Sequence, residues 1–150
     1  INWFVNDNFN INANAGWLNA EFDEFINEFG EDLSGRDQAH APSYTFSLNF
    51  NYQQGPWFAS VSADGKDNFF FSDRHSIKSK RYTLYNASLG FESGQWKVTL
   101  WGRNLTDKDY YVRGFGSFGN DPRNFYVTEP YFQYGEPRVT GVTLQLTMGG

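Results

Sequence analysis

Arginine and aromatic residues gather between positions 101 and 126, and their side chains suit the binding of a small molecule. Aromatic rings stack on flat or apolar surfaces, and a guanidinium forms paired hydrogen bonds to a carboxylate or a phosphate. An anionic ligand or a sugar would use both kinds of contact. The candidate ligand-binding residues are Trp101, Arg103, Tyr110, Tyr111, Arg113, Phe115, Phe118, Arg123 and Tyr126.

Each of these residues also has a purely structural interpretation. Arg103 would pair with a neighbouring carboxylate if it points into a water-filled interior, because a charge there needs compensation. The loop aromatics would pack one loop against the next. The ligand-binding hypothesis therefore rests on the group rather than on any single residue.

Other kinds of chemistry find no support in the sequence. His40 and His75 are isolated from each other, and neither a GxSxG nucleophile motif nor a phosphate-binding P-loop is present. The acidic residues between Glu21 and Asp32 lack the spacing of a calcium-binding loop, so we expect a solvated loop there. The chain has no cysteine. We therefore expect no catalytic site, no metal site and no cofactor.

The charge balance argues against a nucleic-acid partner. The net charge is -5, and the 12 lysines and arginines are scattered along the 150 residues. Binding to phosphate backbones requires a concentrated basic patch.

Apolar and polar residues alternate with period two in seven stretches, as in β-strands with two different faces. In residues 138–148, Val142, Leu144, Leu146 and Met148 share one face and Gly141, Thr143, Gln145 and Thr147 share the other. Such alternation is typical of transmembrane strands that face lipid on one side and water on the other. The expected strands cover residues 1–5, 9–17, 44–52, 57–63, 85–91, 96–103 and 138–148.

The strand at 96–103 indicates which face of the predicted membrane strands points toward lipid. Trp96, Val98, Leu100 and Gly102 are expected to face outward, and Lys97, Thr99, Trp101 and Arg103 inward. A basic residue facing lipid would be costly, so the opposite orientation is disfavoured.

The connections differ strongly in length. Long ones, about 73–81 and 105–137, alternate with short ones such as 93–95, as when short turns face the periplasm and long loops face the cell exterior. Within the connection after Trp17, Phe22, Phe25, Ile26 and Phe29 have helical spacing, which predicts a short amphipathic helix.

Seven strands do not close a bacterial barrel of even strand number, so we expect the chain to be one part of a larger barrel. The alternative is a soluble β-sandwich that binds carbohydrate through its loop aromatics, since a sandwich also alternates polar and apolar residues. Its turns would recur every 8 to 12 residues or so, unlike the long connections here.

Motifs at the C-terminal end carry a more specific signal. WKVTLWGRNLTDKDYYVRGF (96–115), FGNDPRNFY (118–126) and YGEPRVTGVTLQLTM (134–148) follow one another in the chain, and GWLNAEFDEF (16–25) and DLSGRDQAHAPSYTFSLNFNY (32–52) lie upstream. In order and spacing they resemble the C-terminal part of a TonB-dependent outer-membrane receptor. The resemblance extends over essentially the whole chain.

The resemblance implies an all-β fold: about seven C-terminal strands, spanning residues 1–150, of a 22-stranded transmembrane barrel with a plug, the plug and N-terminal strands being absent from this sequence. It also implies a site in the bacterial outer membrane, contact with its lipid, and insertion by the barrel-assembly machinery. The implied function is TonB-energised uptake of a ferric siderophore, cobalamin or an oligosaccharide, with the TonB complex contacting the missing N-terminal part. One departure is Met148, which stands where the family usually has a terminal aromatic residue.

Overall fold

A computed structural model describes residues 1–115, 121–127 and 129–148 of the chain. Its regular structure is almost entirely β. No helix in these described ranges is long and apolar enough to span a membrane. The strands are β1 (Asn2–Asn6), β2 (Phe9–Trp17), β3 (Tyr44–Gln54), β4 (Trp57–Lys66), β5 (Tyr82–Ser93), β6 (Trp96–Arg103), β7 (Tyr111–Phe115), β8 (Tyr131–Tyr134) and β9 (Val139–Leu146), with a 3₁₀ turn η1 (Pro122–Asn124).

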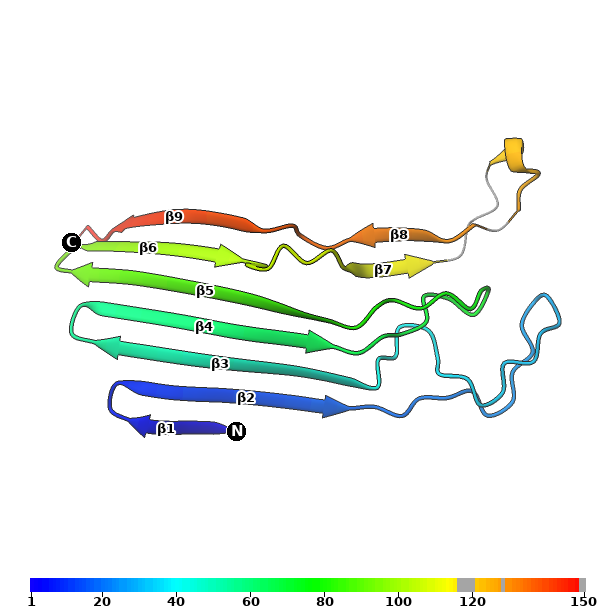
Figure 1. Cartoon of the computed structure of the whole chain (residues 1–150), viewed down its shortest axis with the longest axis horizontal. Helices are drawn as coiled ribbons and strands as arrows, with labels where there is room; N and C mark the ends of the chain where they lie inside the picture. The colour runs from blue at the N-terminus through cyan, green and yellow to red at the C-terminus, as the bar shows by residue number, and fades with distance from the viewer. Residues whose placement is uncertain (116–120, 128, 149–150) are drawn as a thin grey trace.

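Seven strands form one antiparallel sheet in the order β1-β2-β3-β4-β5-β6-β9. Short turns join them at one end, and the long connections leave from the other (Figure 1). The hairpin of β7 and β8 prolongs the β6 and β9 pair beyond the sheet (Figure 1). The seven predicted strands are confirmed. The sandwich alternative is wrong, because no second sheet packs on this one within the described residues.

The strand register separates an apolar face from a polar one. Cross-strand neighbours on the outer face include Leu89, Leu100 and Val142, which lie side by side on β5, β6 and β9. No Asp, Glu, Lys or Arg from the seven paired strands lies on this face. Tryptophans mark its ends: Trp57 and Trp96 lie beside the short turns, and Trp17 pairs with Tyr44 at the loop end. Such aromatic positions match the two interfaces of a bilayer.

The inner face is polar, and its side chains form two groups of hydrogen bonds. The Asp64 carboxylate accepts hydrogen bonds from Ser47 (2.7 Å), Ser62 (3.1 Å) and Asn86 (3.2 Å). Asn51 donates to Asn10 across the β2 and β3 pair at 2.9 Å. These contacts satisfy the polar groups of a wall that faces water or other protein.

The fully buried apolar side chains lie in the long connections, beyond the sheet. Phe69 and Phe71 are each 2% exposed, and Leu33 is 8% exposed. The sheet itself is one layer thick, so its side chains stay half-exposed or exposed on both faces. The packed core of this chain therefore holds the loops together.

The predicted helix over residues 22–29 is wrong. This segment turns back on itself through isolated bridges, Glu21 to Asp37 and Ile26 to Asp32. Side-chain acceptors replace the helical pattern, because Asn27 and Asp32 accept hydrogen bonds from backbone N–H groups two to four residues ahead of them.

Candidate functional site

Trp101 and Arg103 lie on the inner face of β6, close to its loop end. The Trp101 ring packs over the backbone of Gly141, and its Nε1 donates to Thr143 Oγ1 at 3.0 Å. The Arg103 guanidinium donates to Glu136 Oε1 at 2.7 Å and lies 5.2 Å from the centre of the Trp101 ring. The structural interpretation of Arg103 therefore holds, since a carboxylate neutralises it.

A shallow pocket of about 260 Å³ opens beside these two residues. Hydroxyl and amide groups from β4 and β5, chiefly Ser60, Ser62 and Asn86, form its wall together with Trp101 and Arg103. The pocket offers a ring for stacking and several neutral hydrogen-bond partners. It is suited to a polar ligand or to a polar surface of neighbouring protein.

Asn104 connects this wall to the last loop. It is 2% exposed, and its side chain donates to the carbonyls of Lys108 (2.9 Å) and Glu136 (3.0 Å) while accepting from the Lys108 N–H (2.9 Å). Its own N–H donates to Asn86 Oδ1 on β5. The backbone φ of +46° is a left-handed conformation that Asn tolerates better than most residues.

Two segments of the family motifs, NLTDK (104–108) and GEPR (135–138), contact each other across this junction. Asp107 of NLTDK accepts a hydrogen bond from the Arg138 N–H at 2.9 Å, and Arg138 belongs to GEPR. The Tyr110 ring lies against the backbone of Gly135 and packs at a tilted angle against the Tyr82 ring, with the ring centres 4.6 Å apart. The motifs that carried the family resemblance therefore form the clamp that aligns β6 with β9.

Substituting Gly135 tests this clamp. A β-carbon at Gly135 would overlap the Tyr110 ring, so Gly135→Ala should lower the free energy of unfolding by about 1–3 kcal/mol through overpacking. Tyr110→Ala removes the obstacle, and the double variant should show a smaller loss than the two single losses added together. Denaturant unfolding of the full receptor in lipid vesicles measures both. Strictly additive losses would contradict the contact.

An aromatic cluster joins three connections that are far apart in sequence. Phe71 contacts Phe69 (5.4 Å), Tyr111 (5.9 Å) and Phe132 (5.0 Å), measured between ring centres. His40 Nε2 lies 2.9 Å from the Gly114 carbonyl oxygen. Residues 18–43, the connection from β4 to β5 and the β7–β8 hairpin therefore pack as one unit.

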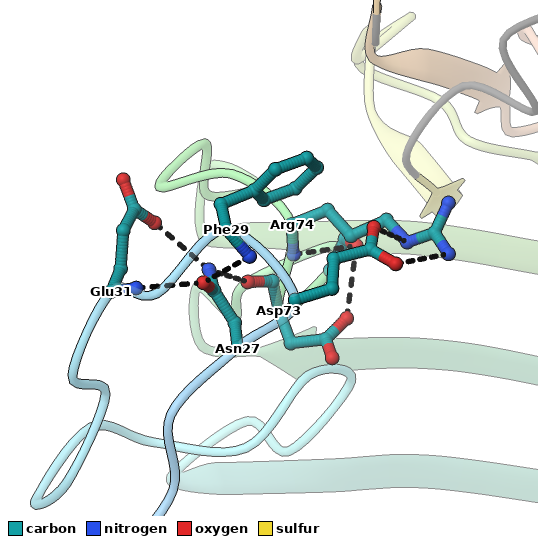
Figure 2. Close-up of polar contacts among 7 residues, drawn as sticks. Asn27, Phe29, Glu31, Asp73 and Arg74 are labelled. Carbon is teal, nitrogen blue, oxygen red and sulfur yellow. Dashed lines mark hydrogen bonds and ion pairs between the residues drawn. The ribbon is translucent and has the colours of Figure 1, made fainter.

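Asn27 fixes the far end of this unit. Its side chain donates to Glu31 Oε2 (2.9 Å) and to the Asp73 carbonyl (3.1 Å), and it accepts from the Phe29 and Glu31 N–H groups (Figure 2). Arg74 pairs with Glu28 at 2.9 Å beside it. Glu28, Glu31 and Asp32 of this loop thus serve as hydrogen-bond or ion-pair partners. No metal-binding group of side chains is present in the described ranges.

The remaining candidates lie on the β7–β8 hairpin and its tip. Arg123 pairs with Asp121 at 2.9 Å, and this partner lowers the pKa of the Asp121 carboxyl. Tyr126 is exposed, with a φ of +61°. The Arg113 guanidinium lies 5.8 Å from the centre of the Phe115 ring, and Arg113 forms no ion pair among the described residues. Arg113 is consequently the candidate arginine most available to an anion.

The structure divides the nine candidates into groups. Trp101 and Arg103 share the wall pocket, and Tyr110 and Tyr111 are packed in the clamp and the aromatic cluster. Arg113, Phe115, Arg123 and Tyr126 belong to the hairpin and its tip. Phe118 lies outside the described residues. The sequence interpretation missed the loop-ordering roles of Phe69, Phe71 and Asn104, although the run Phe69-Phe70-Phe71 in a predicted loop was a usable signal.

Comparison with known proteins gives a consistent set of similarities. No family model matches the chain. The ferric-pyoverdine M114 receptor PbuA of Pseudomonas sp. (strain M114) is 40% identical over 89 residues, which are 56% of this chain and 10% of that protein. The chain therefore spans only a small part of this curated relative.

Two solved structures superpose on nearly the whole chain. The siderophore receptor PiuA from Acinetobacter baumannii gives a TM-score of 0.74 at 19% identity, covering 95% of this chain and 20% of that one. The ferric yersiniabactin uptake receptor FyuA from Yersinia pestis gives 0.76 at 14% identity, covering 97% and 22%. The sheet thus has the fold of about a fifth of such a receptor. These similar proteins are receptors and not enzymes, in agreement with the predicted lack of a catalytic site.

Proposed function

We propose that this chain, which belongs with the TonB-dependent outer-membrane receptors, forms the C-terminal part of a plugged barrel wall, and that the whole receptor imports a ferric siderophore. The observation that carries the proposal is the seven-stranded antiparallel sheet with one uncharged apolar face and one polar face. A wall of this kind is stable where lipid covers one face and a polar interior covers the other.

The ligand class rests on two supports. The similar proteins are, by name, receptors for ferric pyoverdine and ferric yersiniabactin and a siderophore receptor. The β7–β8 hairpin also presents Arg113, Phe115 and Tyr126, and this combination of a cation with rings suits an anionic iron chelate. Cobalamin and oligosaccharides are the competing ligands.

The remaining partners follow from the same proposal. The barrel-assembly machinery inserts the wall into the outer membrane, and the TonB complex energises uptake through the N-terminal part of the whole receptor. Residues 1–150 would contribute the wall, its outer loops and the clamp between β6 and β9.

Uptake by cells tests the proposal. The full receptor is produced as the sole high-affinity importer, and cells receive either ⁵⁵Fe-siderophore, cobalamin or a maltooligosaccharide, with and without functional TonB. We expect TonB-dependent accumulation of iron alone. Accumulation of cobalamin or sugar without iron uptake would overturn the ligand class, and TonB-independent uptake would overturn the mechanism.

Arg113 provides the residue-level prediction. Arg113→Ala should weaken binding of an anionic ferric siderophore by about tenfold to a hundredfold, because a charge-assisted hydrogen bond is worth about 1.5–3 kcal/mol. Arg123→Ala is the matched comparison, since Asp121 already pairs with that guanidinium, and should weaken binding less than about threefold. Quenching of tryptophan fluorescence by the bound chelate measures both. Equal effects of the two substitutions would contradict the assignment.

A further inference from the structure

Three of the twelve basic side chains have no partner among the residues that the structure describes. Nine of them form an ion pair, a hydrogen bond or a contact with an aromatic ring within the described residues. Within the same residues, Lys80, Arg81 and Lys108 form none of these through their side chains. An exposed cation without a partner is free to bind an anion from outside the chain.

Two of these cations line one hollow. Arg81 precedes β5, in step with the outward-facing Thr83 and Tyr85, and Lys108 follows the NLTD turn beside them. The hollow has a volume of about 430 Å³. The rest of its lining carries hydroxyl groups and consists of Tyr44, Tyr82, Thr83, Tyr85 and Thr106. It lies at the loop end of the apolar face, where an outer leaflet would present its headgroups.

An apolar groove begins directly below this hollow. Leu89, Leu100 and Val142 lie along it, and the small side chain of Ala87 leaves room between them. Leu105 packs over Gly102. The groove is open to the surface and has a volume of about 610 Å³. Leu105 lies at its upper end, and the Leu105 N–H donates to the Tyr85 carbonyl, so the groove and the cationic hollow meet at one backbone contact.

We infer that the hollow and the groove together bind a phosphorylated lipid of the outer leaflet. The phosphate lies between Arg81 and Lys108, and an acyl chain lies along the groove past Leu105 and Ala87. Cations at a membrane surface attract anionic headgroups. An acyl chain that lies in the groove contacts its apolar side chains in one fixed arrangement. The inference depends on the proposed placement of the apolar face in lipid, and it is independent of which ligand the receptor imports.

The continuity of the two parts favours a lipid over other occupants. A free anion would need the cationic hollow alone, and a partner protein would need a groove that is accessible from water. Only an amphiphile places a charged group above and a hydrocarbon chain below within one molecule.

Lipid binding to the purified full receptor tests the inference. Native mass spectrometry in a neutral detergent follows titration with lipid A, which carries two phosphates and several acyl chains, and with the same lipid after removal of both phosphates. The double variant Arg81→Gln and Lys108→Gln should bind phosphorylated lipid A roughly tenfold more weakly than the native receptor. The matched control is Lys80→Gln, whose residue does not line the hollow, and it should change binding less than about twofold.

A second substitution examines the groove. Ala87→Leu fills it without adding charge and should weaken binding of both lipids by about threefold. Equal binding of lipid A by the native receptor and the double variant would overturn the inference, as would equal losses in the double variant and the Lys80 control. Uptake of ferric siderophore by the same variants separates the two proposals: uptake should persist where lipid binding is lost.

Discussion

Asn104→Ala is expected to lower the free energy of unfolding by about 3 kcal/mol or more, because it leaves buried backbone groups without partners. The Asn104 side chain satisfies the Lys108 N–H and the carbonyls of Lys108 and Glu136, at 2.9–3.0 Å. Asn104 is 2% exposed, so water does not replace these contacts in the folded state. Alanine also tolerates the positive φ at this position less well than asparagine.

Guanidinium unfolding of the full receptor in lipid vesicles measures this loss, and Asn12→Ala provides the matched control. Asn12 also lies on the inner face, but its side chain donates one long hydrogen bond, 3.4 Å to Asn10. Its replacement should cost less than about 1 kcal/mol. Comparable losses in the two variants would contradict the central role of Asn104 in the clamp.

Leu100→Arg is expected to destabilise the inserted barrel by about 2–4 kcal/mol, the cost of a basic residue on the lipid face near the membrane centre. Leu100 lies between Leu89 and Val142, in the middle of the uncharged face. Neither of these cross-strand neighbours offers a charge partner, so the guanidinium would have to reach the interface or pull water inward.

Thr99→Arg provides the comparison, one residue away on the opposite face. Its cross-strand neighbours are Gly90 and Thr143, on the polar side of the wall, where an arginine stays hydrated. We expect a loss of less than about 1 kcal/mol for this variant in the same unfolding experiment. If Thr99→Arg were the more damaging substitution, the orientation of the sheet would be reversed.

The strands and their faces were predictable because their signal is local. Period-two alternation directly reports a two-sided environment, and residues 96–103 were predicted with the bounds that β6 has. Glycines in the short turns, such as Gly55 and Gly94, both at positive φ, also mark where the strands end. In a single-layer wall, little tertiary packing competes with these local preferences.

The loops were less predictable because distant contacts decide their conformation. Residues 22–29 have helical spacing, yet Asn27 bonds to Asp73, 46 residues away, and the chain folds around that contact. Phe69 and Phe71 are buried only because loops from three parts of the sequence converge on them. Periodicity carries no information about such convergence.

The sequence predicts the kinds of residue in the candidate ligand site, but not the partners of each residue. The sequence indicates which side chains suit an anionic ligand, but it does not reveal that Glu136 neutralises Arg103 from 33 residues away. The same limit applies to Tyr111, which packs against Phe132 at 4.9 Å in the loop cluster. Arg113 is the leading candidate because the other two candidate arginines, Arg103 and Arg123, have carboxylate partners.

The most direct test of the central claim is the accessibility of spin labels along β6. These 150 residues contain no cysteine, so Val98→Cys, Thr99→Cys and Leu100→Cys each place one label in this segment of the full receptor. With the receptor in bilayers, labels at 98 and 100 should collide mainly with lipid-soluble oxygen, and the label at 99 mainly with a water-soluble nickel chelate. Uniform exposure to the chelate at all three positions would contradict a membrane wall.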